Sequence, residues 1–193
     1  MNDDLDMRNT ADANAPGQHP PSRTAPFAPR ESDEFYLRLA LEEARHAADL
    51  GEVPIGAVVV YEPIDPGTRR PLAEARVIAR ACNLRETTRD PAGHAEFLAM
   101  KQTAAELDAW RLTGCTVYVT LEPCIMCAGL MHQARIDRCV FGAPDPKAGA
   151  LGTLYRINAD ERLNHTFEVV PGVLKEECAA LLRGFFASKR KKR

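Results

Sequence analysis

Two short segments of this 193-residue chain combine residue types that bind metal ions. The first is His94-Ala95-Glu96, and the second, about thirty residues later, is Pro123-Cys124-Ile125-Met126-Cys127. Because Cys124 and Cys127 are three positions apart at the expected start of a helix, their sulfur atoms face the same way, and the positive end of the helix dipole favours the thiolate form. With His94 as a third ligand, one tetrahedral position stays open, which is the pattern of a catalytic zinc site.

Glu96 needs a separate argument, because positions two apart lie on roughly opposite sides of a regular helix. His94 and Glu96 share a site only if His94 occupies an irregular first turn, which the preceding Pro91 and Gly93 favour. Glu96 is then expected to carry a proton beside a metal-activated water molecule without binding the metal itself. It is the predicted catalytic residue, and one zinc ion is the predicted cofactor.

Other interpretations of these residues stay open at this point. A CxxC pair by itself is also typical of a redox dithiol or of two packed cysteines, although neither gives His94 or Glu96 a role. A non-enzymatic alternative is a zinc-stabilised RNA-binding module, which requires a fourth protein ligand, and His132 is the best candidate for it. The presence of both segments, each at the entry of a predicted helix, favours catalytic zinc.

The elements that must position these residues follow from hydrophobic periodicity and turn residues. A helix is predicted from Ser32 or Asp33, either of which can cap it, to Gly51. Further helices are predicted at 94–107, 124–133 and 174–189, and strands at 55–61, 76–82, 115–120, 138–142 and, on a weaker pattern, 166–170. The segment 62–75 contains three prolines and a glycine and is predicted to be a loop. This alternation predicts an α/β fold with one central sheet covered by helices.

Length and composition limit the domain organisation. A chain of this length suggests a single domain, which we place at residues 33–190, between a disordered extension at 1–32, rich in Asp, Asn, Ala and Pro, and a basic tail at 191–193. The net charge of −2 and pI near 6.2 exclude a strongly basic nucleic-acid binder, so any contact with RNA must come from a local patch. The basic run at 188–193 is either such a patch or a solvated tail.

Two absences in the sequence bear on location. No apolar run approaches the ~20 residues that a membrane span requires, and the N-terminal residues lack the pattern of a secretory signal. We therefore expect a cytoplasmic protein that does not interact with membranes. In that compartment cysteines are rarely disulfide-bonded, and those outside the metal motif are expected to pack as small hydrophobic residues: Cys82, Cys115, Cys139 and Cys178.

The H-x-E and P-C-x-x-C pair is the signature of known zinc deaminases, in the cytidine/deoxycytidylate deaminase superfamily. Further fragments narrow the likeness, because the chain over residues 34–190 resembles the bacterial tRNA-specific adenosine deaminases. The fragments that carry this resemblance are Gly51–Ala57, Asn83, Leu121–Gly129, Phe141–Ala143, Asp145, Lys147, Gly149, Gly152, Asn164-His165, Glu176–Cys178 and Phe185-Phe186.

The resemblance implies a three-layer α/β/α, cytidine-deaminase-like fold with a central mixed sheet and helices on both faces. It also implies a homodimer that acts on a tRNA anticodon loop, converting the wobble adenosine to inosine with release of ammonia. His94, Cys124 and Cys127 would together bind one zinc ion per subunit, while Glu96 would shuttle the proton as zinc-bound hydroxide attacks C6 of adenine. Asn83 and Ala95 would contact the substrate.

The chain departs from the family pattern in three places. The N-terminal extension has no counterpart, the loop at 62–75 is longer, and Thr153-Leu154-Tyr155 replaces a stretch that begins with serine. None of these departures touches the zinc motifs. Those motifs also occur in enzymes that act on a free base or nucleoside, such as guanine or cytidine, which stay the alternative substrates; residues 141–152 and 185–186 favour tRNA.

Overall fold

The structure is a computed structural model that describes residues 29–63, 65, 67–68 and 72–191. Its elements are α1 (Glu31–Asp49), β1 (Gly56–Tyr61), β2 (Arg76–Cys82), α2 (Arg85–Thr88), α3 (Ala95–Glu106), β3 (Cys115–Leu121), α4 (Ile125–Ala134), β4 (Arg138–Ala143), the 3₁₀-helix η1 (Ile157–Ala159), β5 (Glu168–Pro171) and α5 (Lys175–Lys191). All the predicted strands and long helices are present, whereas the short α2 and η1 were not predicted. Of the segment 1–32 that was predicted to be disordered, residues 1–28 lie outside the described residues, whereas Glu31 and Ser32 belong to α1. The last two residues of the predicted basic tail also lie outside the described residues.

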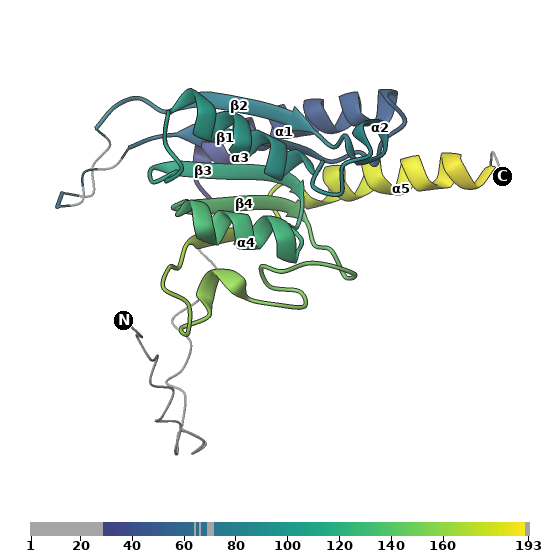
Figure 1. Cartoon of the computed structure of the whole chain (residues 1–193). Helices are drawn as coiled ribbons and strands as arrows, with labels where there is room; N and C mark the ends of the chain where they lie inside the picture. The colour runs from purple at the N-terminus through teal and green to yellow at the C-terminus, as the bar shows by residue number, and fades with distance from the viewer. Residues whose placement is uncertain (1–28, 64, 66, 69–71, 192–193) are drawn as a thin grey trace, which may run out of the picture.

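The five strands form one mixed sheet in the order β2-β1-β3-β4-β5 (Figure 1). Strand β1 is antiparallel to both β2 and β3, and the pairs β3–β4 and β4–β5 are parallel. Strands β2, β3, β4 and β5 therefore point in the same direction, and β1 points in the opposite one. Their carboxyl ends meet at one edge of the sheet, the position at which α/β proteins commonly bind ligands.

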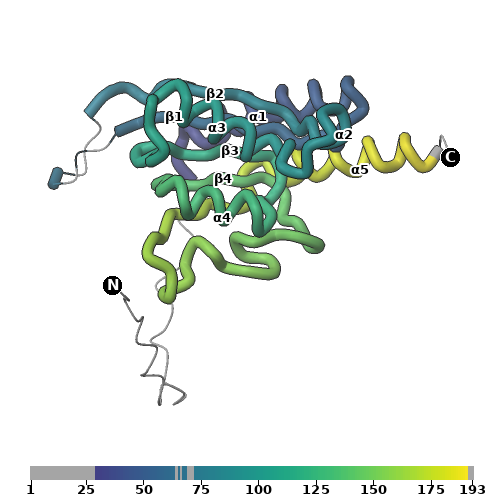
Figure 2. The backbone as a smooth tube through the Cα atoms, viewed as in Figure 1, coloured from purple at the N-terminus to yellow at the C-terminus, as the bar shows by residue number. Residues whose placement is uncertain are grey.

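Alternation of side chains along the strands separates two cores. Val58 and Val60 of β1 pack with α1 and α5 on one face of the sheet, and Ala57 and Val59 pack with α3 and α4 on the other. Figures 1 and 2 show the helices as separate layers in front of and behind the strands. This arrangement confirms the three-layer α/β/α fold. None of the helices in the described part of the chain is long and apolar enough to cross a bilayer.

The start of α1 differs from the prediction. Its N-cap is Arg30, so neither Ser32 nor Asp33 caps the helix. Asp33 lies in the first turn and accepts a 2.7 Å hydrogen bond from the backbone N–H of Arg30. Asp33 is fully buried, because its carboxylate also contacts side chains in the protein core. It therefore stabilises the first turn from a position within the helix and not as the N-cap.

Candidate metal and active site

Three potential metal ligands converge where α3 and α4 begin. His94 and Cys124 are the N-cap residues of these helices and have extended backbone angles, and Cys127 lies in the first turn of α4. The Nδ1 atom of His94 lies 3.6 Å from each of the two sulfur atoms, and all three ligand atoms are within 4.8 Å of one another. The fold thus brings together the three residues predicted as ligands.

The donor set fits zinc. Zinc–sulfur bonds of about 2.3 Å and zinc–nitrogen bonds of about 2.0–2.1 Å at a tetrahedral angle separate nitrogen from sulfur by about 3.6 Å, the separation that His94 has from both cysteines. No fourth histidine, cysteine or carboxylate joins the group in the described part of the chain. His132 is buried elsewhere, with its ring 5.9 Å from that of His165, so it does not close the site as the RNA-binding-module alternative requires.

The electrostatics of the three residues prepare them to bind a cation. A hydrogen bond from Cys127 lowers the pKa of the Cys124 thiol to about 4, against the opposing effect of burial, and His94 lowers it further. The same hydrogen bond, together with burial, raises the pKa of Cys127. The hydrogen bond to Cys124 raises the pKa of His94. The lowered pKa of Cys124 favours its thiolate form, which is the form that binds a metal ion.

Glu96 lies in the first regular turn of α3, two residues after the extended His94. This geometry confirms that the irregular helix start brings His94 and Glu96 to one site. The side chain of Glu96 is only 4% exposed, and burial raises its pKa. A carboxyl group with a raised pKa beside a set of metal ligands is suited to accept and return a proton.

A cavity of about 190 Å³ opens beside the ligands, and Asn83, Glu96 and Asp145 are among the polar residues that line it. Asn83 directly follows β2 and is almost fully buried. Its Nδ2 donates hydrogen bonds to Glu52 Oε2 (3.1 Å) and to the Val53 carbonyl oxygen (3.4 Å). Within the described residues its Oδ1 makes no hydrogen bond, so this oxygen is available to a ligand.

Ala95, the other predicted substrate contact, has a fully buried side chain that does not line the cavity. The structure therefore does not place Ala95 at the surface of the cavity.

Glu52 is one of two buried carboxylates that the sequence analysis missed. Besides orienting Asn83, it accepts a 2.6 Å hydrogen bond from the backbone N–H of Thr87 in α2. Burial alone would raise the pKa of Glu52, but the hydrogen bonds from Thr87 and the Glu86 backbone, together with the charge of Arg85, outweigh it and lower the pKa. The carboxylate therefore stays ionised and fixes the orientation of the Asn83 amide. A motif search restricted to metal ligands does not reveal this role of Glu52.

Glu122 is the second buried carboxylate, and it stands between β3 and the ligand Cys124. It accepts hydrogen bonds from the backbone N–H groups of Asp145 (3.1 Å), Leu151 (3.1 Å) and Thr153 (3.0 Å), and from the Thr153 hydroxyl. The segment 145–153 is thus held against the metal-ligand loop. An acidic residue directly before the P-C-x-x-C motif, at the end of an apolar strand, was the available sequence signal.

The glycine at position 149 belongs to the same arrangement. A Cβ atom there would lie 2.3 Å from Glu122 Oε2, so a larger residue would displace the carboxylate. The backbone N–H of Ala150 adds a 2.9 Å hydrogen bond to the carbonyl oxygen of Pro123. Thr153, where the chain departs from the family pattern, belongs to the same arrangement, because its hydroxyl donates a hydrogen bond to Glu122.

A model of the MafB19-like deaminases matches residues 31–190. A tRNA-specific adenosine deaminase of Bacillus subtilis is 48% identical over 161 residues, which are 83% of this chain and 92% of that protein. The chain belongs to the tRNA-specific adenosine deaminases. A second member of the family, from Haemophilus influenzae, is 42% identical to this deaminase over 163 residues, 84% of this chain and 88% of that protein.

Two solved structures share the fold of this chain. One from a study of A-to-I editing by tRNA:A34 deaminases superimposes on this deaminase with a TM-score of 0.68 and 38% identity, over 76% of this chain and 98% of the other. A guanine deaminase from Nitrosomonas europaea shares the fold, with a TM-score of 0.62 at 24% identity, over 93% of this chain and 99% of the other. Because the chain belongs to a deaminase family and its two CxxC sulfurs lie beside His94, the redox interpretation of the pair is not favoured.

Proposed function

We propose that this deaminase hydrolyses adenosine to inosine at the wobble position of tRNA. The observation that carries the proposal is the His94, Cys124 and Cys127 group beside a buried Glu96, in a chain that is 48% identical to a tRNA-specific adenosine deaminase. The domain responsible is the segment 33–190. Because the substrate is tRNA, we expect the enzyme to work in the cytoplasm.

His94, Cys124 and Cys127 are the residues that would hold the zinc ion, one for each chain. When bound, zinc supplies a Lewis acid that lowers the pKa of water towards ~7 and so makes a nucleophile available at neutral pH. Three protein ligands suit this chemistry, because the fourth tetrahedral position stays open.

Glu96 moves the protons of the reaction. Its carboxylate accepts the proton of the attacking water and returns it to N1 of the adenine ring as C6 is attacked. It then moves the proton of the new C6 hydroxyl group to the amino nitrogen, which leaves as ammonia while the C6 carbonyl of inosine forms. Asn83 positions the nucleoside, because its amide nitrogen is held by Glu52 and Val53 and its Oδ1 faces no competing donor within the described chain. Burial of both side chains keeps bulk water from competing for these contacts.

His94, Cys124 and the buried Asn83 and Glu96 line a cavity of about 190 Å³. A target base must leave its stack before it reaches these side chains, and the loop of an anticodon presents bases that are already unpaired. The position of these residues in a cavity supports a loop nucleotide as the substrate over a nucleotide in a duplex.

The remaining RNA contacts and the assembly are also part of the proposal. Lys189 and Arg190, near the end of α5, and Lys147, beside the cavity loop, are exposed and would neutralise phosphates, so that affinity falls with salt. A homodimer would cover Ile125, which is 55% exposed at the start of α4.

The direct test is an assay with an anticodon stem-loop and with free adenosine, cytidine and guanine. We expect ammonia release from the stem-loop only, and none from the stem-loop with Glu96→Ala, which should retain its zinc. Lys101→Ala, an exposed change on α3, is the matched control and should behave as wild type. Release from the free compounds with none from the stem-loop would contradict the proposal, as would normal turnover in zinc-loaded Glu96→Ala.

A further inference from the structure

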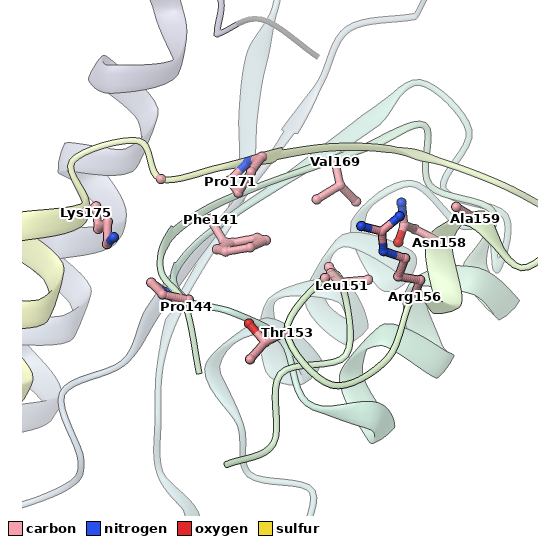
Figure 3. Close-up of a pocket in the computed structure, with 12 residues that line it drawn as sticks. Phe141, Pro144, Leu151, Thr153, Arg156, Asn158, Ala159, Val169, Pro171 and Lys175 are labelled. Carbon is pink, nitrogen blue, oxygen red and sulfur yellow. The ribbon is translucent and has the colours of Figure 1, made fainter. Parts of the chain in front are cut away.

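A second cavity, of about 470 Å³, lies apart from the metal ligands (Figure 3). It is lined by residues of β4 and β5, the start of α5 and the segment 151–159, it is partly open to solvent, and none of the three metal ligands lines it. Its volume falls within the range of about 300–1,000 Å³ that is typical of small-molecule sites. The cavity beside the metal ligands, at about 190 Å³, is less than half as large.

The polar side chain of Asn158 lines this cavity without a hydrogen bond in the described part of the chain. The residue is 9% exposed, and its Oδ1 atom is buried and unpaired. Buried amide oxygens in proteins are nearly always hydrogen-bonded, so an unpaired one indicates a missing donor. A ligand with an N–H or O–H group would supply that donor.

Two cations, Lys175 and Arg156, also line the cavity, and neither forms an ion pair within the described residues. Lys175 is the first residue of α5, a helix of 17 residues, so the positive end of the helix dipole adds to its charge. The glutamates beside it face other partners. Glu176 lies 3.9 Å from Arg183, and Glu177 lies 3.0 Å from Arg38. The cavity therefore has a net attraction for an anion, with Lys175 and Arg156 drawn at opposite ends of it in Figure 3.

The space between these polar groups is apolar. Phe141 and Val169 of the sheet and Leu151 of the covering segment form its walls, with Pro171 at the strand end. The aromatic ring of Phe141 and the aliphatic side chains suit a flat ring more than a second charged group. Anion binding at one end, a flat ring in the middle and a hydrogen-bond acceptor at the other end together describe the parts of a nucleotide.

We propose that this cavity is a second binding site, for a nucleotide. Lys175 and the start of α5 hold the phosphate, Phe141 and Val169 contact the base, and the side-chain amide of Asn158 pairs with an amino or imino group of the base. Asn158 can both accept and donate, and an asparagine amide is a common partner of adenine.

The nucleotide site and the metal site share a wall. Leu151 and Thr153 line the nucleotide site, and the backbone N–H groups of both donate to Glu122, which lines the cavity beside the metal ligands. An occupant of the nucleotide site therefore contacts the same segment that Glu122 holds against the ligand loop.

The nucleotide has two sources, a free mononucleotide or a nucleotide of the RNA substrate, and the second rests on the proposed function. Three variants address the site: Lys175→Ala removes a cation, Asn158→Ala removes the acceptor, and Gly152→Leu fills the space. The last is sterically mild at its first atom, because a Cβ at Gly152 would meet nothing within 4 Å. Gly184→Leu, with equally open surroundings on α5 and outside the cavity, and Lys101→Ala are the matched controls.

The zinc-loaded full chain is titrated calorimetrically with adenosine 5′-monophosphate and cytidine 5′-monophosphate, and each variant is melted to confirm that it is folded. We expect Lys175→Ala, Asn158→Ala and Gly152→Leu each to weaken mononucleotide binding about tenfold, a loss on the order of one hydrogen-bonded or charge-assisted contact. The controls and Asn83→Ala, which changes the other cavity, should bind as wild type does.

The RNA arm measures KM and kcat for an anticodon stem-loop with the same variants. If mononucleotides do not bind wild type but KM rises about tenfold in the site variants with kcat unchanged, the nucleotide belongs to the RNA. The proposal is overturned if folded site variants match wild type in both arms, or if mononucleotide binding is lost only in Asn83→Ala. The calorimetric titration does not depend on deamination. A wild type that binds mononucleotides at this site but does not deaminate the stem-loop would therefore contradict the proposed function and leave the nucleotide site in place.

Discussion

Asp33 and Arg138 form a bidentate ion pair in the protein interior, with hydrogen bonds of 2.6 and 2.8 Å between the guanidinium and the two carboxylate oxygens. Both side chains are almost completely buried. The hydroxyl of Tyr118 also donates to Asp33, and Arg138 donates to Glu168 on β5. One ion pair thus joins the start of α1 to three neighbouring strands of the sheet.

Loss of this pair should cost more stability than loss of an exposed one. Asp33→Ala leaves the buried Arg138 with Glu168 alone, and we expect the free energy of unfolding to fall by about 3 kcal/mol. Arg80→Ala removes a half-exposed arginine that pairs with Glu42 and Glu43, and should cost less than about 1 kcal/mol. Urea unfolding at neutral pH measures both, and equal losses would show that the buried pair has no special part in stability.

The same pair makes stability depend on pH in the acid range. Burial tends to raise the pKa of Asp33, but its hydrogen bonds with Arg138, Arg30 and Tyr118 outweigh burial and hold the pKa below its ordinary value of 3.8. Asp33 therefore binds fewer protons in the folded state, so its contribution is complete above about pH 5 and is lost as pH falls through the folded pKa. Unfolding free energies between pH 6 and pH 3 should fall less steeply for Asp33→Asn than for wild type, and parallel curves would contradict this assignment.

Metal content should depend on two of the six cysteines. Cys124→Ser and Cys127→Ser are expected to lose bound zinc and all measurable deamination, because thiolates supply two of three protein ligands. Cys139→Ala changes a buried cysteine on β4 outside the ligand group and should retain one zinc ion per chain. Elemental analysis of the purified proteins decides the point, and full zinc content in both serine variants would refute the ligand assignment.

Glu122 should act as a positioning residue for the cavity loop. Glu122→Ala removes the acceptor for three backbone N–H groups and the Thr153 hydroxyl, so we expect unfolding free energy to fall by about 2–3 kcal/mol. We also expect KM for the stem-loop to rise more than kcat falls, because Asp145 would lose its anchor. Glu122→Gln retains an acceptor and should recover part of the loss; no difference between the two variants would rule out this role.

The sequence predicts the fold well where local patterns and burial agree. The run Ile55–Tyr61 is apolar because both sides of β1 are covered, by α1 on one face and α3 on the other. The short α2 was missed since none of its residues is buried, and a helix without an apolar face leaves no periodicity to detect. The cap of α1 was misassigned because Asp33 serves a tertiary ion pair, which local propensity does not contain.

The sequence predicts those residues of the site that lie within the two metal-binding motifs. The residue types that bind metal ions or transfer protons occur within a few residues of two helix starts: His94 and Glu96 at one, Cys124 and Cys127 at the other. Glu52 and Glu122 act through partners that are distant in sequence, Asn83 and Thr153. No spacing rule points to Glu52, and the place of Glu122 next to the P-C-x-x-C motif does not reveal its partners. The cavity around Asn158 is likewise formed by β4, β5 and a loop, and only their packing places the unpaired amide inside it.

The central claim is that this chain, with zinc on His94, Cys124 and Cys127, converts a wobble adenosine to inosine. The most direct measurement is sequencing of total tRNA after incubation with the zinc-loaded protein, with zinc-loaded Glu96→Ala as the matched control. The account predicts that the wobble adenosine of one or more tRNAs is read as guanosine after treatment with wild type and stays adenosine with the variant. An unchanged wobble adenosine after incubation with folded, zinc-loaded wild type, or equal conversion by Glu96→Ala, would contradict it.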